Sequence, residues 1–235
     1  MNLFKRWLRK QSPALTAAQS ERLAAWKMLP NAIPHAPFEN SRYVVVDVET
    51  TGLNLRKDSL ISIGAVAVVN GRIELADSFS VVLQQHESST KENILIHGIS
   101  GSVQREGSAP VDALLNFIEY LGKSPLVAFH VFFDETMINR AMSQYLGLSF
   151  KHPWLDLAYV LPALYPRLAH SHHSLDAWSS EFNIHNEERH NALADALVTA
   201  QLMLISMAQI RRTEAPTFDA LRYIERTLRN ATGRV

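Results

Sequence analysis

Two carboxylates stand two residues apart in the stretch YVVVDVETTGL, which runs from Tyr43 to Leu53. The β-branched run before them predicts a buried strand, and Thr51-Gly52 predicts a turn after it. Alternate residues of a strand share a face, so Asp47 and Glu49 project together, roughly 6 to 7 Å apart along the backbone. Paired acids in a buried place repel each other, and a divalent cation with oxygen ligands, such as Mg²⁺ or Mn²⁺, relieves the repulsion. The alternative is a strand whose outer face simply meets water.

A third carboxylate, Asp134, lies between two predicted elements. Residues 126–129 read as a short apolar strand, and a helix is expected from about Glu135 to Leu146, before Gly147. An acid between a strand and a helix stands where α/β sheets often bind ligands. A residue just before a helix can also be only its N-cap.

His190 and Asp195 precede an alanine-rich helix expected over residues 196–208. Positions five apart on an ideal helix are about 140° out of phase, so the two residues cannot share one helical face. We therefore expect His190 on the loop before the helix and Asp195 facing Asp47 and Glu49, which would place a base beside the metal ligands. The alternative is an exposed histidine and a carboxylate favoured by the helix dipole.

Three motifs in this order resemble the DEDDh exonucleases, the family that includes the proofreading epsilon subunit of bacterial DNA polymerase III. They are DVETTGL from Asp47, Phe133-Asp134 and the H-x-x-x-x-D of residues 190–195, and the similarity spans about 165 residues. The chain departs from the family at Phe129-His130, where members usually carry histidine and then asparagine. The metal-binding aspartate is kept, and whether His130 replaces the asparagine contact stays open.

The resemblance implies a 3′–5′ exonuclease that releases nucleoside 5′-monophosphates. Two divalent cations, Mg²⁺ or Mn²⁺, would be held by four carboxylates, and His190 would deprotonate the attacking water. In similar enzymes the turn after the first acids receives the terminal nucleotide, which assigns substrate binding to Thr50, Thr51 and Leu53; a chain reversal at Gly52 alone would also explain the turn. The four carboxylates are Asp47, Glu49, Asp134 and Asp195.

The substrate implied is a single-stranded or frayed 3′ end, with DNA favoured over RNA. An RNA or oligoribonucleotide exonuclease of the same family is one alternative. A non-catalytic nucleic-acid-binding or polymerase-associated module is the other, and the presence of all four acids and His190 speaks against it.

The elements needed to position these groups predict an α/β fold. Together with the resemblance they imply a ribonuclease H-like mixed sheet, with three antiparallel strands, parallel additions and flanking helices. Strands are expected over 60–69 and 72–83, joined by the hairpin signal Asn70-Gly71. Residues 84–110 are expected to be loop with one short helix, and Ile96-His97-Gly98-Ile99 either resembles a family segment or is a structural turn. A helix is expected over 111–121.

Two further sets of polar residues have open roles. Asp156 is expected to be structural. His170, His172 and His173 could suggest zinc, but their spacing fits no regular helical or strand face and no fourth ligand is evident. The resemblance of HHSLDAW to a helix start of the family favours capping and packing near Ser174 instead.

The chain divides into three predicted regions. Residues 1–40 form a helical extension with a proline-containing connector, 41–209 the exonuclease domain, and 210–235 a helical tail; either end could carry a polymerase or another protein partner. The 23 basic and 23 acidic residues cancel, so nucleic-acid binding must be local. Cysteine is absent, and no stretch approaches the roughly 18 apolar residues of a membrane span, so a cytoplasmic protein without an integral membrane segment is expected.

Overall fold

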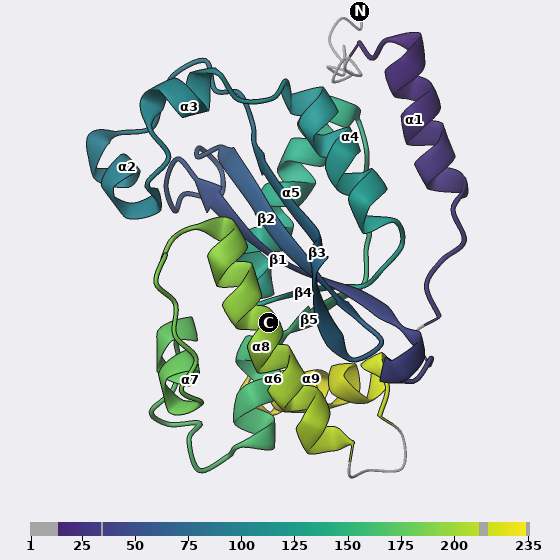
Figure 1. Cartoon of the computed structure of the whole chain (residues 1–235), viewed down its shortest axis with the longest axis vertical. Coiled ribbons are helices and arrows are strands. Elements are labelled where there is room, and N and C mark those ends of the chain that lie inside the picture. The colour runs from purple at the N-terminus through teal and green to yellow at the C-terminus, as the bar shows by residue number, and fades with distance from the viewer. Residues whose placement is uncertain (1–13, 34, 212–215, 234–235) are drawn as a thin grey trace, which may run out of the picture.

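A five-stranded mixed sheet in the order β3-β2-β1-β4-β5 forms the centre of the molecule (Figure 1). The computed structural model describes residues 14–33, 35–211 and 216–233. Strands β1, β2 and β3 are antiparallel neighbours, whereas β4 and β5 run parallel to β1. This arrangement confirms the predicted fold class. The strands are β1 (Arg42–Thr50), β2 (Leu60–Val69), β3 (Arg72–Val82), β4 (Leu126–Ala128) and β5 (Trp154–Asp156).

Strand β1 contributes to a core on each face of the sheet. Val44, Val46 and Val48 belong to one hydrophobic cluster, and Tyr43 and Val45 belong to the other. This alternation follows from the two-residue period of a strand. The same period directs the side chains of positions 47 and 49 to the face of Tyr43 and Val45.

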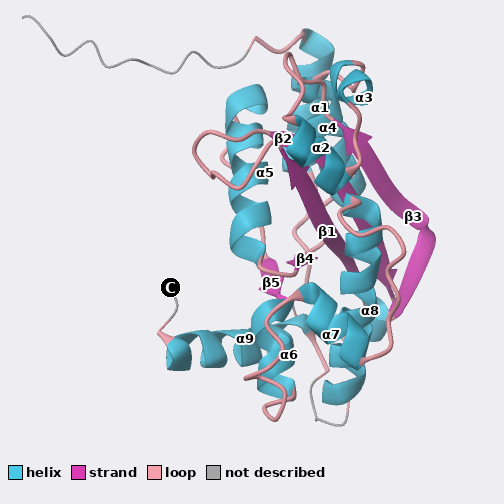
Figure 2. Cartoon of the chain, turned by 90° about the vertical axis from the view of Figure 1, so that its left-hand side faces the viewer, coloured by secondary structure: helices cyan, strands magenta, loops and turns pink. Residues whose placement is uncertain are grey.

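Helices cover both faces, and Figure 2 shows the sheet between α5 on one side and α8 on the other. The first core joins the sheet to α1 (Ala17–Met28), α4 (Pro110–Leu121) and α5 (Val131–Leu146). The second joins it to α6 (Leu157–Leu164), α7 (Leu175–Glu181), α8 (Ala192–Ile210) and α9 (Phe218–Thr232).

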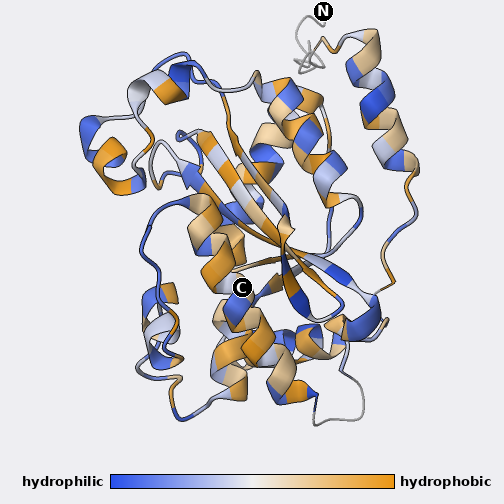
Figure 3. Ribbon diagram, in the orientation of Figure 1, coloured by the Kyte–Doolittle hydropathy of each residue, from blue (hydrophilic) through white to orange (hydrophobic). Residues whose placement is uncertain are grey.

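Helix α8 is apolar along most of its length (Figure 3). It is the one helix in the described ranges that is long and apolar enough to cross a membrane, so the expectation that no stretch approaches such a span was wrong in length and composition. However, most of its residues are buried, and it packs on β1, β2 and β3. Its composition is therefore that of a helix at the centre of a folded domain.

The hairpin between β2 and β3 forms where the sequence predicts it. Asn70 and Gly71 both have positive φ, 52° and 76°, as the tight two-residue turn requires.

Several element boundaries differ from the predictions. The segment 84–110 holds two helices, α2 (Lys91–His97) and α3 (Gly101–Arg105), and the short strand β5 was not predicted. Helices α5 and α8 each begin four residues earlier than expected. For α8 the reason is Asn191, whose side chain caps the helix by accepting bonds from the backbone N–H groups of residues 193 and 194.

Both terminal helices pack on the domain. Trp26 of α1 donates an indole hydrogen bond of 2.7 Å to the carbonyl of Gly122, and Thr16 and Gln19 form a capping box at the start of this helix. In α9, Phe218 and Leu221 are fully buried, and Phe218 stacks on Tyr43 with ring centroids 5.5 Å apart. The first 13 residues of the predicted N-terminal extension lie outside the described residues.

Candidate active site

Strand β2 and the start of α8 meet at Gly64. This residue pairs with Asp47 in the β1–β2 ladder. A side chain at Gly64 would place its Cβ only 2.1 Å from the backbone nitrogen of Leu193. The absence of a side chain therefore lets the first turn of α8, with Asp195, approach the strand that carries Asp47 and Glu49.

Three of the predicted metal ligands form one compact group. Carboxylate oxygens of Asp47, Glu49 and Asp195 all lie within 4.8 Å of one another. Such a set of hard oxygen donors suits a divalent cation such as Mg²⁺ or Mn²⁺. The sequence prediction that Asp195 faces the two strand acids agrees with this geometry.

Asp134 lies in the first turn of α5 and lines the same cleft as the three grouped acids. Its side chain is buried. The alternative that Asp134 is the N-cap of the helix is wrong, because α5 begins at Val131 and His130 occupies the N-cap position. The first turn of α5 was not predicted from the sequence, because it contains the apolar residues Phe132 and Phe133.

The charges of the acids act on one another. Burial raises the pKa of Asp47 well above its ordinary value, and the nearby charges of Asp134, Asp195 and Glu49 raise it further. Burial, with the charge of Asp195, raises the pKa of Glu49 to about 8. Burial also raises the pKa of Asp134, although hydrogen bonds from backbone N–H groups oppose this. These shifts mean that the ionised cluster is costly, so a bound cation would stabilise it.

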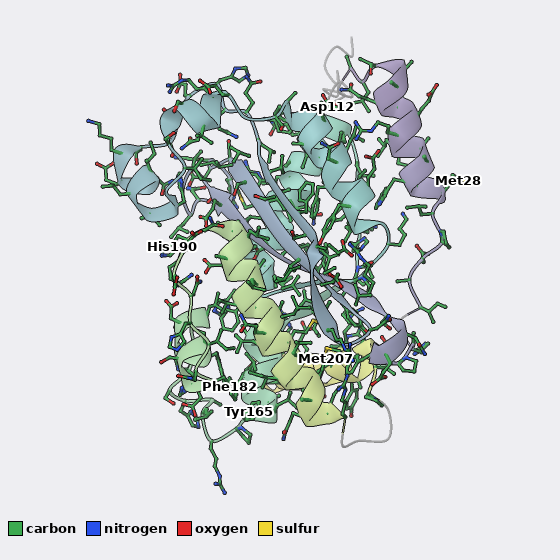
Figure 4. All side chains as sticks on the ribbon, viewed as in Figure 1. Met28, Asp112, Tyr165, Phe182, His190 and Met207 are labelled. Atoms are coloured by element: carbon green, nitrogen blue, oxygen red, sulfur yellow. The ribbon has the colours of Figure 1, made fainter. Side chains whose placement is uncertain are left out.

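His190 lies on the loop ahead of α8, as expected, and Figure 4 labels it at that end of the helix. Its backbone is in the left-handed region with φ of 62°, and its N–H donates a 3.1 Å hydrogen bond to Oδ2 of Asp195. The side chain is exposed and lines the cleft. The imidazole is therefore beside the acids and accessible from the cleft.

The acids open into a cleft of about 620 Å³. Thr50 and Leu53, two of the predicted substrate contacts, line it, and Leu53 is 86% exposed. Thr51 is not among the lining residues: its hydroxyl donates a 3.0 Å hydrogen bond to Asp58 and accepts one of 2.9 Å from the N–H of Ser59. The structure thus gives Thr51 a role in the turn and leaves Thr50 and Leu53 on the cleft wall.

Part of the cleft lining also comes from α2, and sequence reasoning did not predict that this segment reaches the cleft. Asn93 donates a 3.1 Å hydrogen bond to the carbonyl of Thr50, and Ile96 presents an exposed apolar side chain. His97 is buried and accepts a 3.0 Å bond from the N–H of Ile99, while Gly98 ends the helix in the left-handed conformation. The segment therefore forms a structural turn and also lines the cleft.

Arg189 is the cleft residue that sequence reasoning missed most clearly. Its guanidinium lies 2.6 Å from each carboxylate oxygen of Asp195 and also bonds Asp176. The sequence held one signal for this contact, because a cationic residue stands directly before His190 in a segment expected to face acids.

The remaining polar residues have structural contacts. Asp156 is buried and accepts hydrogen bonds of 3.0 Å from the N–H groups of Ala158 and His130, in agreement with a structural role. His172 pairs with Glu181 at 3.2 Å, and the ring of His130 lies 3.1 Å from the carbonyl of His173. Ser174 caps α7.

Comparison with known proteins identifies the family. The model of the exonuclease family RNase_T matches residues 44–203. DNA polymerase III PolC-type from Bacillus subtilis is 32% identical over 171 residues, which cover 72% of this chain and 12% of that protein. The chain thus spans about an eighth of the length of this relative.

Solved structures share the fold. Escherichia coli exonuclease I in complex with a dT13 oligonucleotide matches with a TM-score of 0.62 and 15% identity, over 73% of this chain and 42% of that one. Exonuclease X in complex with 5′ overhanging duplex DNA matches with a TM-score of 0.58 and 20% identity, over 76% and 99% of the two chains. Since the family model covers more than half of the sequence, the chain belongs to the exonuclease family and carries a 3′–5′ exonuclease domain of the DEDD type.

Proposed function

We propose that this protein removes nucleoside 5′-monophosphates from the 3′ end of DNA in a reaction that depends on two divalent cations. The observation that carries the proposal is the oxygen cluster of Asp47, Glu49 and Asp195, which opens into a cleft also lined by Asp134 and His190. Bound cations would supply an activated water and would stabilise the leaving oxygen. Mg²⁺ and Mn²⁺ both suit these ligands.

Side chains of the protein would bind the cations and accept a proton. The four carboxylates, Asp47, Glu49, Asp134 and Asp195, would hold the cations. His190 would take the proton of the attacking water at its exposed imidazole, the side chain that most often serves as a general base.

The cleft wall offers contacts for a terminal nucleotide. The exposed side chains of Leu53 and Ile96 are suited to pack against a base, and the loop at Thr50 is held by Asn93. DNA is favoured because PolC-type relatives are DNA polymerases by name and two structural neighbours are complexes with DNA. A protein partner at either end and a cytoplasmic location stay predictions.

Product analysis tests this proposal. Equal concentrations of single-stranded DNA and RNA of one sequence would be digested with Mg²⁺ or Mn²⁺, and the released nucleotides identified by mass spectrometry. We expect deoxynucleoside 5′-monophosphates, formed faster than their ribonucleotide counterparts. Faster digestion of RNA would assign the enzyme to the alternative RNA substrate, and release of 3′-monophosphates would contradict the mechanism.

A further inference from the structure

Arg189 makes a two-sided ion pair at the centre of the candidate active site. Its Nη1 lies 2.6 Å from both Oδ1 and Oδ2 of Asp195. The other side of the guanidinium bonds the carboxylate of Asp176 through Nε and through Nη2, the latter at 3.1 Å. Arg189 therefore joins α7 to the first turn of α8 through two carboxylates.

The contacts of Arg189 complete the hydrogen bonding of Asp195. Besides Arg189, Oδ1 accepts a 2.5 Å bond from Nδ2 of Asn186, and Oδ2 accepts a 3.1 Å bond from the N–H of His190. An ionised carboxylate offers about four acceptor sites. Since all of them are used, Asp195 can bind a cation only if one donor leaves.

Arg189 is the donor that a cation would displace. Asn186 and the His190 N–H are neutral, so they can remain beside a bound cation, whereas the guanidinium carries a like charge. The arginine is also the partner nearer to solvent, because its side chain is 32% exposed while that of Asp195 is 5% exposed. Its second partner, Asp176, is 60% exposed and anchors the guanidinium in its place against Asp195 through Nε and Nη2.

We propose that Arg189 competes with a divalent cation for Asp195, so that the affinity of the site for metal is set in part by the release of this arginine. The proposal rests on the proposed function, which assigns Asp195 to metal binding. In the opposite role, Arg189 would orient Asp195 for the metal. The two roles differ in the sign of the effect on metal affinity when the arginine is removed.

Calorimetric titration of Mn²⁺ into the protein without nucleic acid measures this sign. In Arg189→Ala, two charge-assisted hydrogen bonds no longer have to be broken, so we expect Mn²⁺ to bind about ten- to a hundredfold more tightly than in the unaltered protein. Asp176→Asn weakens the second anchor of Arg189 without altering a proposed metal ligand, and a smaller increase in affinity is expected. Arg167→Ala removes an exposed arginine outside the cleft and should leave the affinity unchanged.

The outcomes separate this inference from the proposed function. Equal or weaker Mn²⁺ binding by Arg189→Ala, with binding by the unaltered protein intact, overturns the competition alone. No Mn²⁺ binding by either protein at millimolar metal overturns the proposed metal site itself. If Arg189→Ala does not fold, as judged by circular dichroism, Asp176→Asn decides: unchanged or weaker affinity in that variant overturns the competition.

Discussion

Replacement of Gly64 by alanine should disrupt the site without touching any acid. An added Cβ would lie 2.1 Å from the nitrogen of Leu193 and 2.3 Å from the carbonyl carbon of Ala192, both backbone atoms. To reach the 3.4 Å of ordinary contact, β2 and α8 must separate by about 1.3 Å, the difference between 3.4 and 2.1 Å. Asp195 would move with the helix, away from Asp47.

Gly64→Ala is expected to lower both kcat and the free energy of unfolding. Misplacement of catalytic groups by about 1 Å can lower the rate on the order of a hundredfold, so kcat on a single-stranded DNA substrate should fall by about this factor. Overpacking should lower the free energy of unfolding by about 1 to 3 kcal/mol. Steady-state digestion and urea denaturation measure the two effects separately.

Gly101→Ala is the matched control. The nearest atoms to its added Cβ are side-chain atoms of Ser88 at 3.1 Å, and Gly101 lies at the start of α3. Both substitutions restrict the unfolded chain equally, so a difference between them reports the contact with α8. Gly64→Ala with the kcat and stability of the control would refute the argument that this close approach positions Asp195.

Three further predictions concern the acids and the histidine. Asp47→Asn should abolish exonuclease activity yet raise the free energy of unfolding in chelator by about 1 kcal/mol, because it removes a charge repelled by its neighbours; a less stable variant in urea denaturation would contradict this. The folded-state pKa of Glu49, about 8, lies above its ordinary 4.5, so the stability it contributes is complete below about pH 4.5 and is lost as the pH rises through 8. In chelator, the free energy of unfolding should fall between about pH 5.5 and 7.5, and Glu49→Gln should make this fall smaller by about 1.4 kcal/mol per pH unit. If the variant and the unaltered protein lose stability equally over this range, the raised pKa of Glu49 is contradicted. His190→Ala should lower kcat about 10²- to 10⁴-fold while calorimetric Mn²⁺ affinity stays the same, and a lost affinity would make His190 a metal ligand instead of a base.

The sequence predicted the central sheet because its signals are local. The β-branched run before Asp47 and the Asn70-Gly71 turn each determine a strand or hairpin from a few neighbouring residues. The assignment of Asp134 and Asp195 as metal ligands came from the resemblance of their motifs to the DEDDh family, and the structure places both on one cleft with Asp47 and Glu49. The spacing of His190 and Asp195 also gave the correct element for each, a loop and a helix.

What escaped prediction depends on contacts between distant segments. Strand β5 is only three residues long and exists because β4 pairs with it. The placement of Ile96 on the cleft wall comes from the packing of α2 against the turn after β1, through Asn93. Arg189 was overlooked because its role depends on Asp176 and Asp195, which the fold brings together from α7 and α8.

Digestion of single-stranded DNA labelled at its 5′ end tests the central claim most directly. The unaltered protein, Asp47→Ala and the control Glu21→Ala, which removes an exposed carboxylate on α1, would each be incubated with Mg²⁺, Mn²⁺ or chelator. We predict a ladder that shortens from the 3′ end with either metal, is absent in chelator and in Asp47→Ala, and is unchanged in Glu21→Ala. Shortening that persists in chelator or in Asp47→Ala would contradict a metal-dependent exonuclease centre built on these acids.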